Sequence, residues 1–225
     1  MLLSYIQDVT PLQTEKTLSL LELIKNGGLG GQLIIGVLFV LLLIVTYIYF
    51  ERLFAIRSAV KFTPNFMPQI RSFVINGKLD GAQQLCVQEN VPVARLISKG
   101  LSRIGRPLDD INTAIENAGR LEVYQLEKNI SILATISGAA PMLGFLGTVI
   151  GMILSIFEIS NAGGNIDMQL LADGLYTAMT TTVAGLIVGI VGYICFNHLV
   201  VKINKAIYQM EASSLEFLDL LNEPA

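Results

Sequence analysis

Five threonines are the side chains best placed to do chemistry in this chain. Thr177, Thr180, Thr181 and Thr182 cluster at one end of an apolar segment, and Thr148 lies in the middle of another. A hydroxyl both donates and accepts hydrogen bonds, so two threonine-bearing faces could line a wet, narrow conduit. A threonine in a membrane helix can instead bond its own i−4 carbonyl and have no function. Either interpretation holds for one threonine, and the clustering favours the conduit.

Small residues surround these threonines at heptad spacing. In the first segment they are Ser137, Pro141, Gly144, Thr148, Gly151 and Ser155. In the second they are Gly174, Ala178, Thr182, Gly185, Gly189 and Gly192. Small faces let helix backbones approach closely, which drives helix association in lipid. We therefore predict helix packing at Gly144, Gly147, Gly151, Gly185 and Gly189, with alanine tolerated better than leucine at Gly147 and Gly185.

Pro141 lies within the first of these small faces. A proline lacks the backbone N–H donor and frees the carbonyl of Ser137, so the sequence predicts a kink or a water site there. Pro141 shares a face with Thr148, which strengthens this prediction.

Ionisable residues are missing from the apolar segments themselves, which contain no Asp, Glu, Lys or Arg. A proton-driven device normally needs an ionisable group at depth. Either this chain moves no ions, or the titrating group belongs to another subunit. With one histidine and two cysteines, and no HExxH motif or serine–histidine constellation at depth, we expect neither an enzyme nor a cofactor or metal site.

Three helices must position these residues. The chain has 225 residues, of which 52% are hydrophobic and 15% charged, well below the roughly 25% charged residues of soluble domains. A span needs about 20 apolar residues, and three windows qualify, at 31–50, 130–157 and 175–200. The sequence therefore predicts an all-α, polytopic membrane protein whose three transmembrane helices extend into a cytoplasmic helical bundle.

Orientation follows from the cations. Segment 51–129 holds 11 of the 15 lysines and arginines, whereas the connection 158–174 holds none. Cytoplasmic loops carry the excess of cations, so we place 51–129 and a C-terminal helix at 201–225 in the cytoplasm. The short loop 158–174 and residues 1–30, with an amphipathic helix, are then outside. A net charge of −3 argues against a nucleic-acid partner.

Turn-forming residues divide the cytoplasmic segment into helices. We predict one helix after Pro64, a second around Leu79–Gln88, and a third capped by Asn90 that ends near Gly105. The first span should continue as a helix into residues 51–60. A last helix should begin at Asp109 and run unbroken through the second span to Phe157, about 73 Å at the standard rise.

The two small-residue segments resemble a known family. The stretch GAAPMLGFLGTVIGMILSIF (138–157) resembles the second transmembrane segment of the MotA/TolQ/ExbB proton-channel family, and GLYTAMTTTVAGLIVGIVGYICFN (174–197) is similar to its third. ERLFAIRSA after the first span and VPVARLISKGL further on look like the ExbB and TolQ branch. Three spans with a large insertion between the first two match that branch rather than the four-span MotA type.

This resemblance implies a subunit of an ion-driven motor in the inner membrane of a Gram-negative bacterium. Such chains form a homo-pentamer around single-span ExbD- or TolR-like partners, which supply an essential aspartate. Proton-motive force then does work on a TonB-like protein for import across the outer membrane. By motif, Thr148 and Thr182 correspond to pore-facing threonines, and Pro141 corresponds to the proline of the second span. We also place Thr181 and Thr177, which lie beside the small-residue stripe of the third span, on the proton pathway.

One position departs from the family pattern. Many relatives carry a glutamate five residues before the third-segment threonine, where this chain has Thr177. A proton route that requires this glutamate is therefore in question, unless hydroxyls and water replace it. Two alternatives remain open besides the ExbB-like role: a TolQ-like motor subunit for envelope maintenance, and a membrane scaffold that conducts nothing.

Overall fold

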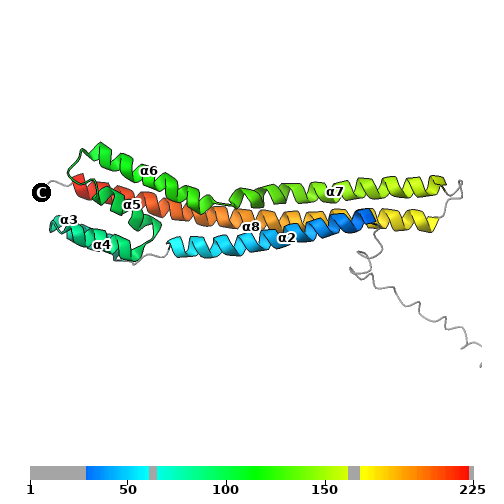
Figure 1. Cartoon of the computed structure of the whole chain (residues 1–225), viewed down its shortest axis with the longest axis horizontal. Helices are drawn as coiled ribbons and strands as arrows, with labels where there is room; N and C mark the ends of the chain where they lie inside the picture. The colour runs from blue at the N-terminus through cyan, green and yellow to red at the C-terminus, as the bar shows by residue number, and fades with distance from the viewer. Residues whose placement is uncertain (1–28, 61–64, 162–167, 223–225) are drawn as a thin grey trace, which may run out of the picture.

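Long helices dominate the structure. The computed structural model describes residues 29–60, 65–161 and 168–222. Over these ranges it contains helices and no strands, and the element order is α2 (Leu29–Val60), α3 (Phe66–Ile75), α4 (Leu79–Glu89), α5 (Pro92–Leu101), α6 (Leu108–Glu127), α7 (Ile130–Asn161) and α8 (Met168–Asn222). Figure 1 shows a long, narrow molecule with all helices roughly along one axis. The amphipathic helix predicted within residues 1–30 lies outside the described residues, as does part of the predicted outer loop.

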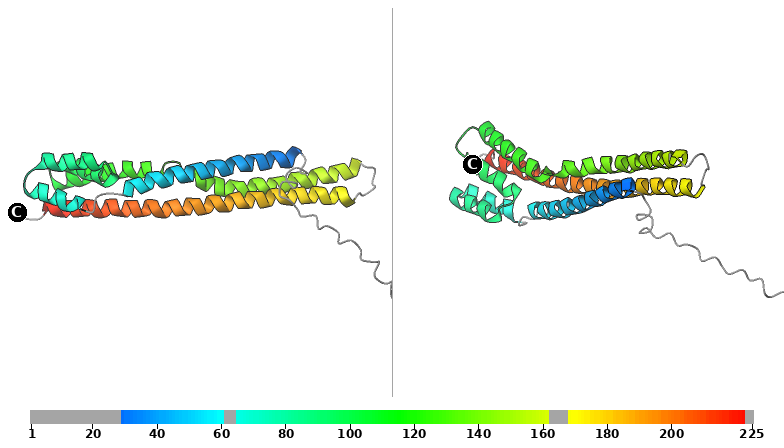
Figure 2. Two further views of the ribbon diagram at one scale, coloured as in Figure 1. Left: turned by 90° about the horizontal axis from the view of Figure 1, so that it is seen from below. Right: turned by 45° about the vertical axis from the view of Figure 1, so that its right-hand side comes forward.

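Helix α8 is the spine of the molecule. Its 55 residues extend about 80 Å at the standard rise. Helix α7 packs along its first half, α2 lies along its middle, and α3, α5 and α6 contact its second half, as the two rotated views in Figure 2 also show. Three helical stretches, around α2, α7 and the first half of α8, are long and apolar enough to cross a membrane. The predicted fold class, an all-α membrane protein with three spans, is confirmed.

We call the part built from the apolar stretches of α2, α7 and α8 the apolar bundle. The part built from α3 to α6, the end of α2 and the second half of α8 is the polar bundle. The polar bundle has its own core, in which Phe66, Ile70, Ile97 and Phe217 are fully buried. A Cβ on Gly100 would lie 2.6 Å from the Phe217 ring, so the aromatic side chain of α8 fits against bare backbone of α5.

An ion pair joins two helices of the polar bundle. Arg95 of α5 donates from Nε and Nη2 to the two carboxylate oxygens of Glu122 of α6, at 2.7 and 2.6 Å. Its Nη1 donates to the backbone oxygen of Asn90 at 2.8 Å. The hydrogen bond to Glu122, more than the burial that opposes it, raises the pKa of Arg95. The pair fixes α6 against α5 with a two-pronged geometry that neither Lys nor Gln can reproduce.

Several helix boundaries were predicted correctly. The first span continues as one helix to Val60, α4 covers the predicted 79–88, and α6 begins directly after Pro107 with Asp109 and Asp110 in its first turn. Carboxylates at that end are favourable because the helix dipole leaves partial positive charge there. The assignment of segments to the membrane, the cytoplasm and the outer face stays a prediction.

The predicted unbroken helix from Asp109 to Phe157 was wrong. Helix α6 ends at Glu127 and α7 begins at Ile130. Lys128 adopts an extended backbone (φ −52°, ψ 132°) and Asn129 has φ +64°. Asparagine tolerates the left-handed region better than most residues. Lys128 and Asn129 can therefore turn the chain between α6 and α7 without a proline or a glycine.

The predicted role of Asn90 and the predicted end of α5 were also wrong. Asn90 has φ +44° and closes α4 at its C-terminal end rather than capping α5, and Val91 is the residue before α5. Helix α5 ends at Leu101, and a series of turns continues to Arg106. Gly105, with φ +94°, lies in those turns and not at the helix end.

Candidate functional site

The site is built on the contact between α7 and α8. These helices run in opposite directions, and their small faces meet along most of the apolar bundle. A Cβ on Gly185 would lie 2.6 Å from the carbonyl oxygen of Ala140 and 2.9 Å from the Gly144 α-carbon. A Cβ on Gly144 would lie 2.8 Å from the carbonyl oxygen of Thr181. Backbone therefore touches backbone at Gly144 and Gly185, where only glycine fits.

The same close approach continues in both directions from this point. Gly147 faces the Thr181 side chain at 2.5 Å, and Gly151 faces the Ala178 Cβ at 3.0 Å, both measured from an ideal Cβ. On the other side, Gly189 faces the ring of Pro141 at 2.6 Å. All five glycines predicted to pack helices thus lie in one interface.

Three threonine hydroxyls converge on one carbonyl in this interface. The Oγ1 atoms of Thr148, Thr181 and Thr182 lie 3.3, 3.2 and 3.2 Å from the carbonyl oxygen of Gly144. The hydroxyls of Thr148 and Thr182 also bond to each other, and either can be the donor. Thr181 has a shorter acceptor, the carbonyl oxygen of Ala178 at 2.7 Å.

The number of protons limits which hydrogen bonds the three threonine hydroxyls can make at the same time. Each hydroxyl has one proton, and a carbonyl oxygen has two lone pairs, one of which the α-helical ladder uses. If Thr181 donates to Ala178, one hydroxyl of the Thr148–Thr182 pair donates to Gly144 and the other donates to its partner. The pair can run in either direction, and in both directions hydroxyl lone pairs remain free to accept a proton donor from outside.

Burial separates the threonines into two groups. Thr181 is fully buried between α7 and α8, so within this chain its hydroxyl reaches only helix backbone. Thr148 and Thr182 are half-buried and keep part of their surface at the edge of the interface. Thr180 donates to the carbonyl oxygen of Tyr176, four residues earlier, at 2.9 Å, which is the local bond expected of a threonine without further function. The side chain of Thr177 lies outside the described part of the structure.

Pro141 lies within α7, which continues through it from Ile130 to Asn161. Its ring packs against Gly189, and the carbonyl oxygen of Ser137, freed by the proline, lies 3.1 Å from an ideal Gly189 Cβ. Ser137 turns its own hydroxyl to the carbonyl oxygen of Ala134 at 2.8 Å. The freed carbonyl therefore faces the neighbouring glycine, and the predicted kink stays a prediction.

A second polar contact lies at the end of the apolar bundle that adjoins the polar bundle. The hydroxyl of Tyr49 on α2 is 2.9 Å from Nδ1 of His198 on α8. Three residues further along α2, Arg52 reaches the carbonyl oxygen of Gln125 near the end of α6, at 3.4 Å. Arg52 also pairs with Glu51. These contacts tie the three long elements together where the apolar bundle ends, just beside the break at Lys128 and Asn129.

Sequence reasoning did not find the Tyr49–His198 pair, the Arg95–Glu122 pair or the shared Gly144 carbonyl. The first two join residues 149 and 27 positions apart, and no periodicity in the sequence links them. The third was within reach, because Gly144 and Thr148 are four residues apart and share the small face. Among the residues that the structure describes, no three His, Cys, Asp or Glu side chains come together as metal ligands.

Comparison with known proteins gives the family. The sequence profile of the MotA/TolQ/ExbB proton channel family matches residues 88–212, more than half of the chain. A biopolymer transport protein ExbB homolog from Methanothermobacter thermautotrophicus is 28% identical over 198 residues. The match covers 86% of this chain and 67% of that protein. The biopolymer transport protein ExbB of Aquifex aeolicus is 36% identical over 112 residues, covering 48% of this chain and 74% of the relative.

A TolQ protein also matches. The Tol-Pal system protein TolQ of Haemophilus influenzae is 30% identical over 113 residues, covering 50% of this chain and 49% of that protein. The fold and the close contact between α7 and α8 define an all-α, polytopic membrane protein. The chain belongs to the MotA/TolQ/ExbB proton channel family, and its matched relatives come from the ExbB and TolQ branch.

Proposed function

We propose that this chain is the channel subunit of a proton-driven motor, in which Thr148 and Thr182 line the path of the proton. The observation that carries the proposal is the Thr148–Thr182 hydroxyl pair, half-buried at the edge of the α7–α8 interface. A pair whose bond can run in either direction can accept a proton from one side and release another on the other side, which is what a relay requires. The subunit makes and breaks no covalent bond to carbon and acts as no enzyme.

The titrating acid comes from a different molecule in this proposal. The three spans contain no Asp, Glu, Lys or Arg, and a proton-driven device needs an ionisable group at depth. We assign that group to a single-span subunit of the ExbD or TolR type, held inside a homo-oligomer of this chain, a pentamer by family resemblance. The hydroxyl lone pairs of Thr148 and Thr182 then bond to the acid or to water beside it.

The work is done on a TonB-like protein for import across the outer membrane of a Gram-negative cell, with this chain in the inner membrane, its N-terminus outside and its C-terminus in the cytoplasm. Similarity to two proteins named ExbB or ExbB homolog, one of them over 86% of the chain, supports this version. A TolQ-like role in envelope maintenance is the second candidate, since a TolQ protein also matches. The single-span protein that co-purifies with the chain distinguishes the two, because each role requires a different partner.

The test replaces both hydroxyls with isosteric methyl groups. Thr148→Val with Thr182→Val keeps the shape of the interface and removes the relay. We expect proton flux through the reconstituted complex with its single-span partner, and proton-dependent siderophore uptake in cells, to fall to background. Thr180→Val is the matched control, because that hydroxyl bonds only its own helix in this structure, and it should retain full activity.

Two outcomes would overturn the proposal. Full flux in the Thr148/Thr182 double variant, with a normally assembled complex, would rule out a proton path through these hydroxyls. A complex that carries no proton current with any partner, although it assembles, would support the non-conducting scaffold instead.

A further inference from the structure

A long groove runs between α6 and α8 in the polar bundle. It has a volume of about 740 Å³, and side chains of α6 and α8 form its walls. Leu96 of α5 also lines it, 3.6 Å from an ideal Cβ on Gly119. Large apolar side chains stand on its borders: Tyr124 is 75% exposed and Leu215 is 62% exposed. Exposed apolar area of this kind marks an interaction site on a folded protein.

The two helices that form the groove carry most of the negative charge of the polar bundle. Helix α6 has five carboxylates and one cation, and the last 17 residues of α8 have three carboxylates and no cation. Residues 65–106, by contrast, have six cations and two carboxylates. Glu116, Glu127 and Glu211 line the groove with one cation, Arg120, and within the described part of the chain none of these glutamates is in an ion pair. An occupant that combines an apolar face with positive charge therefore fits the groove best.

The α8 wall of the groove lies on the same side of α8 as Thr182. An α-helix makes one turn in about 3.6 residues. Ile207, Glu211 and Leu218 of the groove follow Thr182 by 25, 29 and 36 residues, which are about seven, eight and ten turns. Because α8 is one unbroken helix (Figure 2), these three side chains project from it in nearly the same direction as Thr182.

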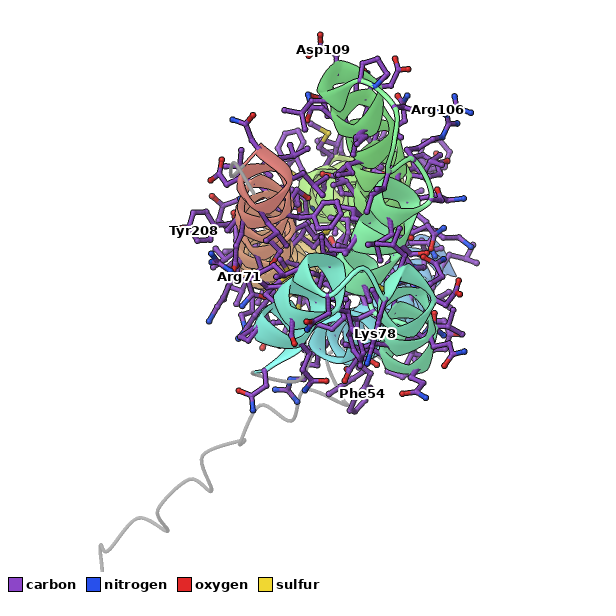
Figure 3. All side chains as sticks on the ribbon, turned by 90° about the vertical axis from the view of Figure 1, so that its left-hand side faces the viewer. Phe54, Arg71, Lys78, Arg106, Asp109 and Tyr208 are labelled. Carbon is purple, nitrogen blue, oxygen red and sulfur yellow. The ribbon has the colours of Figure 1, made fainter. Side chains whose placement is uncertain are left out.

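Helix α2 lies on the opposite side of α8. His198, which contacts Tyr49 of α2, follows Thr182 by 16 residues, about four and a half turns, and so projects in nearly the opposite direction. Figure 3, which looks along the axis from the polar end, shows Phe54 near the end of α2 on the side opposite Asp109 at the start of α6. The groove and the Thr148–Thr182 hydroxyl pair thus share the side of α8 that faces away from α2.

The groove begins a short distance beyond the end of the apolar bundle. The contact between Tyr49 and His198 marks that end. Ile207 and Leu218 follow His198 by 9 and 20 residues, so the groove extends from about 14 to about 30 Å beyond it along α8. A helical segment of about 12 residues would fill this length.

The cytoplasmic flank of a single-span membrane protein has the charge and the position that the groove requires. Cations are enriched within about 15 to 20 residues of the cytoplasmic end of a span. The groove lies about 9 to 20 helical residues beyond the end of the apolar bundle. In the proposed function, the single-span subunit lies beside Thr148 and Thr182. A helix that follows α8 from Thr182 into the cytoplasm therefore brings its basic flank to the groove.

We infer that the groove between α6 and α8 receives the cation-rich cytoplasmic flank of the single-span subunit as a short amphipathic helix. Apolar side chains of the flank pack on Ile207 and Leu218, and its lysines or arginines pair with Glu116, Glu127 and Glu211. The inference rests on the proposed function, which requires such a subunit. It adds a surface outside the membrane that holds the subunit in line with the hydroxyl pair.

Photo-cross-linking in the complete complex tests this contact. p-Benzoylphenylalanine in place of Ser214, which lines the groove, should form a covalent adduct with the single-span subunit. Mass spectrometry should locate the adduct within about 20 residues of the cytoplasmic end of its span. The same photoreactive residue in place of Ala212 is the matched control. Ala212 is exposed but lies about 200° around α8 from Ser214, and it should give no such adduct.

Protection from trypsin is a second measurement that needs no photoreactive residue. Trypsin cleaves after lysine and arginine, so a basic flank bound in the groove is protected in the complete complex. Glu127→Lys with Glu211→Lys should speed cleavage of the flank at least several-fold. Glu216→Lys with Asp219→Lys is the matched control, because it makes the same change of charge at exposed positions of α8 outside the groove. It should leave the cleavage rate of the flank unchanged.

The possible failures are distinguishable. An assembled complex in which Ser214 gives no adduct with the flank, or in which both pairs of charge variants are cleaved alike, would overturn the inference and leave the channel proposal standing. An adduct with a second copy of this chain, or with lipid, would assign the groove to a different occupant and also overturn it. A folded protein with which no single-span subunit co-purifies would overturn the proposed function and the inference together.

Discussion

Gly185 of α8 lies so close to Gly144 of α7 that an added methyl group would be 2.9 Å from the Gly144 α-carbon and 2.6 Å from the Ala140 carbonyl oxygen. Both neighbours are backbone, which cannot rotate away as a side chain can. The two helices can accommodate a methyl group only by moving apart, and that movement would also separate the hydroxyls of Thr148 and Thr182. The close contact of the two glycines is therefore needed to hold the two hydroxyls together.

We predict that Gly185→Ala and Gly144→Ala each destabilise the protein by about 1 to 3 kcal/mol, the usual cost of overpacking, and lower proton flux. The sequence predicted that Gly185 tolerates alanine better than leucine, and the backbone contact adds that alanine is itself costly there. Thermal unfolding in detergent and flux in vesicles measure the two effects. Gly138→Ala is the control, because nothing lies within 4 Å of its added methyl group; an equal loss in Gly138→Ala would contradict the argument.

A variant of Thr181 distinguishes a threonine that packs helices from a threonine that conducts protons. Its hydroxyl is fully buried and bonds the carbonyl oxygen of Ala178 in its own helix at 2.7 Å, so Thr181→Val should cost no more than about 1 kcal/mol, typical of a single hydrogen bond. Flux per assembled complex should stay close to that of the parent protein. The same measurement on Thr148→Val and Thr182→Val should show the reverse, with flux lost and stability nearly kept. A loss of flux in Thr181→Val equal to theirs would place Thr181 on the proton path.

Part of this site was predictable from the sequence, and the reason is geometric. Heptad spacing of small residues fixes which side of each helix is flat, and two flat sides in neighbouring spans are expected to meet, so the glycines and Thr148 and Thr182 could be named in advance. The spacing cannot give the offset between the two helices. That offset decides that Gly144 faces Gly185 and that Thr181 turns inward while Thr182 stays at the edge.

The polar bundle was less predictable. Turn residues located α4 and the start of α6, because Asn-Gly and Pro-Leu-Asp-Asp are strong local signals. The break at Lys128 and Asn129 carries only a weak signal, because lysine is a good helix former and a single asparagine, with no glycine or proline beside it, also occurs inside helices. Pairs such as Arg95 and Glu122 depend on how two helices meet, and the sequence of either helix alone says nothing of the partner.

Removal of one member of the Arg95–Glu122 pair should destabilise the polar bundle. Glu122 is 8% exposed, so Glu122→Gln leaves the guanidinium without its two-pronged acceptor, and hydrogen bonds to charged groups contribute about 1.5 to 3 kcal/mol. We expect a loss of about 2 kcal/mol in denaturant unfolding. Glu116→Gln, an exposed carboxylate on the same helix, should change stability by less than about 0.5 kcal/mol.

A double-mutant cycle isolates the pair from other effects of the substitutions. Arg95→Ala, Glu122→Ala and the double variant should give a coupling energy of about 1 to 2 kcal/mol, below the full cost of either single change, because Arg95 also bonds the Asn90 carbonyl oxygen. Additive single effects would show that the two side chains do not interact in solution.

The buried thiol of Cys86 should make the free energy of unfolding depend on pH. Burial raises the pKa of its thiol from the ordinary value to about 11. The folded protein therefore disfavours the thiolate, and the stability this provides is complete below the pKa of the unfolded thiol and is lost as the pH rises from about 9 to about 11. Cys86→Ala should remove this part of the pH dependence. The difference between the unfolding free energies of the parent and the variant at pH 8 and pH 10.5 measures it, and a constant difference would contradict a buried neutral thiol.

Asn129 lies in the turn between α6 and α7. At φ +64°, glycine is unstrained, asparagine is tolerated, and a β-branched residue is strongly disfavoured. We expect Asn129→Gly to preserve stability and assembly, and Asn129→Val to lose about 1 to 2 kcal/mol. Asn129→Val should also favour a straight helix through residues 127–131, which would carry α6 away from α8 and open the groove between them. Spin labels at Arg120 and Tyr208 would report the wider separation by their distance distribution, and an unchanged distribution in a folded Asn129→Val protein would show that the turn does not depend on this residue.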